Sequence, residues 1–224
     1  VDDLGRVAGR IYSFNTVGSL IGALVGGYAL LFWLDLHHVF RVSLVAIAAA
    51  AGLVTWKALP RMRAAGPVGI VAALVLVILL PAWPTEKLTA GTFRRREPTP
   101  TTYLGPGPFF DSFLLRPPDG RKLVQFYDDD PVASIGVLEV GLTTGTMRAV
   151  LTNGKNDSAL PGDHITTGLL GLLPALFAEE CERAFVVGYG TGLTVGELAA
   201  LSTTREVVAA EISSGVIRAA PIFE

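Results

Sequence analysis

The chain has 224 residues, of which half are hydrophobic and only 17% are charged, and its formal net charge is −2. So apolar a composition is unlike that of an ordinary soluble protein, and the slight acidity argues against a nucleic-acid-binding surface. A single cysteine excludes an internal disulfide. The three histidines lack the spacing to Cys or Asp that a metal site needs, so no metal is expected.

Residues 1–84 contain three apolar runs, and we predict about three membrane-spanning helices there. Residues 11–34 carry no charge, residues 39–59 carry only Arg41 and Lys57 near their ends, and residues 68–83 are uncharged but short. A helix needs about 20 apolar residues to cross a bilayer, which the first two runs supply. We therefore expect an integral protein of the cell membrane, with the lipid bilayer as a partner.

Small residues recur within the first apolar run. Gly18, Gly22 and Gly26 are four residues apart and therefore lie on one helix face. This spacing is typical of surfaces at which two membrane helices pack closely. We predict such packing for this stripe.

A polar linker and a small β domain are predicted next. Residues 85–108 are rich in Pro, Thr, Gly and Arg, and residues 109–160 contain short alternating runs typical of an antiparallel sheet. The expected strands cover 113–116, 122–127, 133–140 and 147–151. Asp128, Asp129 and Asp130 are expected to form a solvated turn, because three adjacent acids do not all point at one ion. Residues 153–157 predict a further polar turn.

The segment from 161 onward predicts a nucleotide-binding unit. A helix is expected over 165–178, with Asp163 as its N-cap. An apolar run at 184–187 then meets Gly188, Gly190 and Gly192, a helical stretch follows at 194–201, and a second β-branched run ends on Glu211. In a βαβ unit of this layout, glycines let the backbone approach a ligand, and the acid accepts hydrogen bonds from the ribose hydroxyls.

The glycine spacing refines the ligand. A dinucleotide fingerprint would place its third glycine at position 193, where the chain has Leu193. The observed G-x-G-x-G pattern instead resembles that of class I S-adenosylmethionine-type folds. A tight turn that binds no ligand is the alternative interpretation.

The predicted fold class is therefore transmembrane α-helices, then a small antiparallel β domain, then the start of an α/β Rossmann-like domain of the class I S-adenosylmethionine type over 161–224. Such a sheet needs about five strands, so we expect an internal part of a longer protein that is inactive alone. Basic residues are balanced between the two sides of the predicted spans, so they do not orient the chain. We place the C-terminal domain in the cytosol, where nucleoside cofactors are made.

Taken together, these segments resemble the membrane-fused branch of the spermidine synthase-like (polyamine biosynthesis domain) family. The resemblance covers residues 9–27, 151–174 and 186–224. It implies transfer of an aminopropyl group from decarboxylated S-adenosylmethionine to an amine. It also implies cofactor binding by Gly188, Gly190, Gly192 and Glu211, substrate binding by Asp163, and a catalytic acid beyond Glu224.

Several positions depart from the pattern of that family. Thr191 stands where the synthases carry Asp, Asn153 stands where they carry Asp, and a Gln of the β domain is replaced around Ala133. A Tyr-His-Glu cluster is replaced near Thr167, Gly168 and Leu169. The positions that bind the cofactor are thus kept, while those that bind a polyamine are substituted. We therefore expect the protein's activity on putrescine to be weak or absent.

Three hypotheses about the function of the protein follow. The first is a membrane-anchored transferase that uses S-adenosylmethionine or its decarboxylated form, with a small amine or another acceptor left open. The second is an S-adenosylmethionine-dependent methyltransferase. The third is a non-catalytic, transporter-like membrane protein with a nucleoside-sensing domain. A homodimer is also left open.

Overall fold

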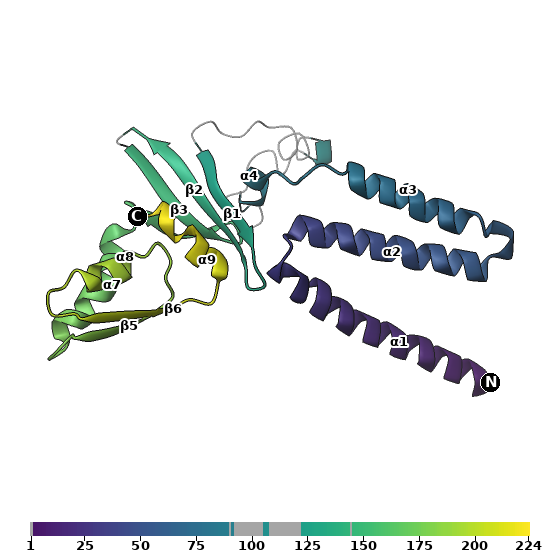
Figure 1. The fold of residues 1–224 in the computed structure, drawn as a ribbon, viewed down its shortest axis with the longest axis horizontal. Coiled ribbons are helices and arrows are strands. Elements are labelled where there is room, and N and C mark those ends of the chain that lie inside the picture. The colour runs from purple at the N-terminus through teal and green to yellow at the C-terminus, as the bar shows by residue number, and fades with distance from the viewer. Residues whose placement is uncertain (1, 90, 92–104, 108–121, 144) are drawn as a thin grey trace. The chain divides into compact units, whose positions relative to one another are not determined.

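The computed structural model describes residues 2–89, 91, 105–107, 122–143 and 145–224 (Figure 1). The chain divides into one compact unit up to Ala82 and a second from Trp83 onward, and each is described by itself. The predicted strand at 113–116 lies outside the described residues.

The first unit is helical. It consists of α1 (Asp2–Gly26), the short 3-10 helix η1 (Ala29–Phe32), α2 (Leu36–Ala58), a second short 3-10 helix η2 (Pro60–Met62) and α3 (Ala65–Leu79). Asp35 caps α2, because its carboxylate accepts the His38 N–H at 2.8 Å. α3 ends before Leu80, the residue that precedes Pro81 and is therefore disfavoured in helical geometry.

Two helical stretches of this unit are long and apolar enough to cross a membrane. They are Asp3–Phe32 and Leu36–Ala58, with 30 and 23 residues. α3 has 15 residues and so spans about 22 Å at 1.5 Å per residue, less than the hydrocarbon thickness of about 30 Å. The prediction of three spans therefore reduces to two helices of sufficient length among the described residues.

α2 and α3 pack side by side as a helical hairpin (Figure 1). Their backbones meet at Gly52 and Gly66, which are both buried. A Cβ added at Gly66 would lie 2.6 Å from the Gly52 carbonyl oxygen. At Gly18, Gly22 and Gly26, by contrast, a Cβ would meet no described atom within 4 Å, so close packing of that stripe stays a prediction.

The second unit contains a four-stranded antiparallel sheet in the order β1-β2-β3-β4. Its strands are β1 (Lys122–Asp129), β2 (Ser134–Leu142), β3 (Gly145–Thr152) and β4 (Lys155–Leu160). The first three confirm the strands predicted at 122–127, 133–140 and 147–151. The fourth was not predicted, since its first three residues are polar and exposed. The short helix α4 (Thr85–Leu88) precedes the sheet, and Thr89 is buried beside Gly136.

The core of this sheet is completed by the C-terminal end of the chain. Val137 and Val150 are buried with Ala219 of α9 (Ser214–Ala219), and Phe126, Ile222 and Phe223 pack around them. Ile222 belongs to the 3-10 helix η4 (Ala220–Ile222), and its carbonyl accepts a hydrogen bond from Arg148 Nη1 at 2.8 Å. Residues more than 70 positions apart thus form one core.

Along the chain, a parallel βαβ unit follows the sheet and precedes α9. α7 (His164–Phe177) leads to β5 (Arg183–Val187), α8 (Leu193–Ala199) and β6 (Glu206–Ala210). β5 and β6 pair in parallel with Arg183 opposite Glu206 and Val187 opposite Ala210. Both strands therefore end at the same edge, and the loops that follow them are neighbours.

Candidate functional site

The loop after β5 has a backbone that only glycine adopts easily. Gly188, Gly190 and Gly192 have φ angles of +86°, +57° and +79°. Side chains with a Cβ are strained in this left-handed region, so the alternating glycines set the path of the loop. Gly192 also leaves room for Tyr189, whose hydroxyl oxygen would lie 2.8 Å from an added Cβ.

Glu211 joins this loop from the adjacent strand end. It follows β6 directly, and its Oε2 accepts the Tyr189 N–H at 2.8 Å while its Oε1 accepts the Ser213 N–H at 2.9 Å. The structure therefore brings together the glycine loop and the acid that the sequence singled out. Each carboxylate oxygen accepts one protein N–H and retains a lone pair for a further donor.

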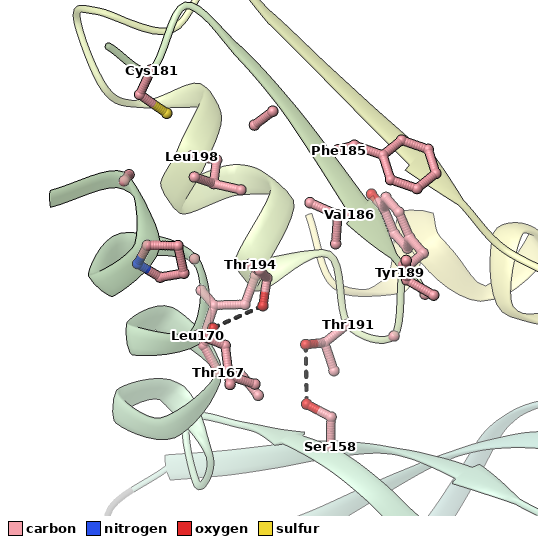
Figure 2. Close-up of a pocket in the computed structure, with 18 of the residues that line it drawn as sticks. Ser158, Thr167, Leu170, Cys181, Phe185, Val186, Tyr189, Thr191, Thr194 and Leu198 are labelled. Carbon is pink, nitrogen blue, oxygen red and sulfur yellow. Dashed lines mark hydrogen bonds between the residues drawn. The ribbon is translucent and has the colours of Figure 1, made fainter. Parts of the chain in front are cut away.

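A cavity of about 680 Å³ adjoins the loop (Figure 2). β5 and the loop form one wall, α7 and α8 form the other, and β4 contributes Asp157 and Ser158. Gly188 and Gly190 line this cavity. Gly192, Glu211 and Asp163 are not among the described residues that line it, so the structure groups Glu211 with the loop backbone rather than with the cavity wall.

Hydroxyl groups dominate the polar lining next to the loop. Ser158 Oγ and Thr191 Oγ1 lie 3.2 Å apart, and both residues are only 7% exposed. Thr194 Oγ1 donates to the Thr167 carbonyl at 2.7 Å, which ties α8 to α7 (Figure 2). Sequence reasoning missed Ser158 because it missed β4. The Asn153-Gly154 pair, a strong two-residue hairpin signal, was the clue that a strand follows.

Asp163 occupies the predicted N-cap position of α7, but its side chain does not cap the helix. Instead, Oδ2 accepts the Ala159 N–H at 2.8 Å and closes the turn between β4 and α7. The Thr167 hydroxyl donates to the Asp163 carbonyl at 2.8 Å. The predicted N-cap position is therefore correct, but the predicted hydrogen bond from the Asp163 side chain to the start of the helix is not formed. Substrate binding by Asp163 stays a prediction.

The three adjacent aspartates do not form a solvated turn, contrary to the prediction. Asp129 and Asp130 are buried, and Asp128 pairs with Arg218. Asp130 accepts hydrogen bonds from Val132 N–H at 2.8 Å, Ala133 N–H at 2.9 Å, Ser213 Oγ at 2.5 Å and Gly215 N–H at 3.1 Å. Within the described residues, no three His, Cys, Asp or Glu side chains gather as a metal site would require.

These hydrogen bonds control the protonation of Asp130. Burial raises the pKa of the carboxyl, but the hydrogen bonds from the Ser213 hydroxyl and from the N–H groups of Ala133, Gly215 and Val132 outweigh it. The pKa of Asp130 therefore lies below its ordinary value. The charged carboxylate fixes the β1–β2 turn to Ser213, which lies two residues beyond Glu211.

No protein-family model matches this chain, and no curated protein matches it either.

Proposed function

We propose that this protein is a membrane-anchored transferase of the spermidine synthase-like class, whose C-terminal unit binds S-adenosylmethionine or its decarboxylated form. The observation that carries this proposal is the contact of Glu211 with Tyr189 N–H in the glycine loop. An acid and a glycine loop that meet at the ends of two adjacent parallel strands are the arrangement by which α/β folds bind nucleosides.

The contacts support a division of roles among these residues. The loop backbone at Gly188 and Gly190 borders the cavity without side chains, so a flat nucleoside can approach it closely. Glu211 is held by two N–H groups, which fixes its carboxylate for hydrogen bonds from ribose hydroxyls. A sulfonium ligand supplies an electrophilic carbon, and the protein's task is to orient that carbon toward an acceptor.

The helical unit supports attachment to a bilayer. The stretches Asp3–Phe32 and Leu36–Ala58 have spanning length, and most of their apolar side chains are exposed, including Leu4, Ile11 and Ile47. Exposed apolar helices of this length are stable when lipid covers them. We place the second unit in the cytosol, where S-adenosylmethionine is made.

Calorimetric titration of the full chain in detergent, with each form of the ligand, tests the proposal. Glu211→Gln is expected to weaken binding about 10- to 150-fold, because a hydrogen bond to a charged group contributes about 1.5–3 kcal/mol. Glu206→Gln is the matched control, since Glu206 begins the strand that ends just before Glu211, forms an exposed pair with Arg183 and is expected to leave binding unchanged. No binding by the wild-type chain, or equal affinities of the Glu211→Gln and wild-type chains, would contradict the proposal.

A further inference from the structure

The turn that joins α2 to α3 carries three basic side chains within seven residues. Lys57 lies in the last turn of α2, Arg61 lies in η2, and Arg63 follows η2. All three are exposed. The 3-10 helix keeps the turn short, since the Met62 N–H donates to the Leu59 carbonyl at 2.9 Å. The three side chains, which we call the basic turn, therefore gather at the end of the hairpin where α2 and α3 are joined (Figure 1).

The helical hairpin itself does not neutralise the basic turn. Among the described residues, none of its three side chains forms an ion pair. The sequence contains no Asp or Glu between Asp35 and Glu86. At the other end of the hairpin, by contrast, Arg41 donates to the Leu80 carbonyl. The hairpin therefore has one end whose basic group is bound by the protein and another end that offers its positive charges to an external partner.

Apolar surface lies directly beside the basic turn. Trp56 precedes Lys57 and is half-exposed, and its Cβ lies 3.4 Å from the position that a Cβ at Gly66 would take. Val54 and Val68, on the two helices beside the turn, are exposed. A tryptophan between apolar surface and basic residues is typical of the place where a membrane helix passes from hydrocarbon into the headgroup layer. The basic turn therefore lies at headgroup level when lipid covers these helices.

We infer that the basic turn binds the anionic headgroups of bilayer lipids. The guanidinium groups of Arg61 and Arg63 can each donate two N–H groups to a phosphate, and the Lys57 ammonium adds a point charge. A zwitterionic headgroup presents the same phosphate beside a choline cation, which the basic side chains repel. The basic turn should therefore select anionic over zwitterionic lipid. This inference rests on the bilayer attachment proposed above and not on the ligand of the second unit.

Quenching of Trp56 fluorescence by brominated lipids measures this selectivity at the turn itself. The full chain is reconstituted into phosphatidylcholine vesicles that contain a small share of brominated phosphatidylglycerol or brominated phosphatidylcholine in both leaflets. The Trp56→Phe chain gives the signal of Trp33 and Trp83, which is subtracted. We expect brominated phosphatidylglycerol to bind about 5- to 150-fold more strongly than brominated phosphatidylcholine, the range for one to three basic residues in contact with the headgroup.

Two matched double variants distinguish a local site from an effect of net charge. Arg61→Gln/Arg63→Gln removes two charges from the basic turn and is expected to lower the selectivity about 5- to 30-fold. Arg183→Gln/Arg205→Gln removes two charges from the second unit, where each arginine already pairs with a glutamate, at 2.7 Å and 3.2 Å. This variant is expected to retain the selectivity. Both variants keep all three tryptophans, so their comparison does not depend on the folding of the Trp56→Phe chain.

The outcomes separate this inference from the proposed attachment. Equal quenching by the two brominated lipids, or the same selectivity in both double variants, overturns the inference while the attachment stands. If neither brominated lipid quenches Trp56, both are overturned. Ligand binding by the second unit is tested in detergent and is unaffected by either result. Circular dichroism verifies that each variant is folded.

Discussion

At the scale of single residues, Asp130 is a buried acid whose charge contributes to stability. Its carboxylate is buried and accepts four hydrogen bonds from two distant segments. Because its pKa in the folded state is lowered from the ordinary value of 3.8, the folded state binds this proton more weakly than the unfolded state. The stabilisation is complete above about pH 3.8 and is lost as the pH falls through the folded pKa.

Asp130→Asn is expected to lower the free energy of unfolding of the second unit by about 2–4 kcal/mol at neutral pH, because charged hydrogen bonds are lost from a buried site. Hydrogen exchange at pH 7 checks this through the amides of β1, β2 and α9. Glu182→Gln serves as the control, since Glu182 is exposed and pairs only at the surface with Arg205. Equal protection in the Asp130→Asn and wild-type chains would remove Asp130 from this role.

The residues of the site differ in how far the sequence predicts them. Gly188, Gly190, Gly192 and Glu211 follow from local spacing, because a short βαβ unit fixes where each must lie. The burial of Asp129 and Asp130 does not follow in this way. Ser213, which donates to Asp130, is more than 80 positions away in sequence, so local sequence alone predicts a solvated turn for these adjacent acids.

At the scale of elements, the α2–α3 hairpin depends on the absence of one methyl group. Gly66→Ala would place Cβ 2.6 Å from the Gly52 carbonyl oxygen, a backbone atom that cannot move without separating the helices. We expect a loss of about 1–3 kcal/mol, the usual cost of overpacking. Thermal unfolding in detergent measures it.

The matched control for this change lies three residues further along α3. Gly69→Ala adds the same methyl group where no described atom lies within 4 Å, so it is expected to be neutral or slightly stabilising. If the two variants unfold at the same temperature, the close approach of Gly52 and Gly66 is not a determinant of the hairpin.

Sequence patterns identify elements better than the partners of those elements. The strands β1, β2, β3, β5 and β6 were predicted from alternation and β-branched runs. The unpredicted β4 begins with Lys155, Asn156 and Asp157, whose polarity suits the exposed edge of a sheet but hides the strand. The glycine stripe of α1 matches a known motif, yet the observed close contact joins two isolated glycines on other helices.

At the scale of the whole molecule, the native cysteine offers a test of membrane orientation. Cys181 is the single cysteine of the sequence, lies in the second unit and is half-buried, with its sulfur 3.7 Å from Thr204 Oγ1. If this unit is cytosolic, a membrane-impermeant maleimide is expected to label Cys181 in permeabilised cells and not in intact ones. A permeant maleimide, which should label both, is the control, and labelling of intact cells by the impermeant reagent would reverse the orientation.

The hydrogen bond between Asp130 and Ser213 also bears on how the protein folds during its synthesis. The two residues are 83 positions apart, so at 5–20 residues per second the ribosome needs about 4 to 17 s to deliver the hydroxyl after the carboxylate. Ala219 follows Val150 by 69 residues, so the sheet face formed by Val137 and Val150 has no Ala219 to cover it for about 3 to 14 s at the same rate. The nascent chain therefore exposes the apolar side chains of Val137 and Val150 for seconds before the C-terminal end of the chain can cover them.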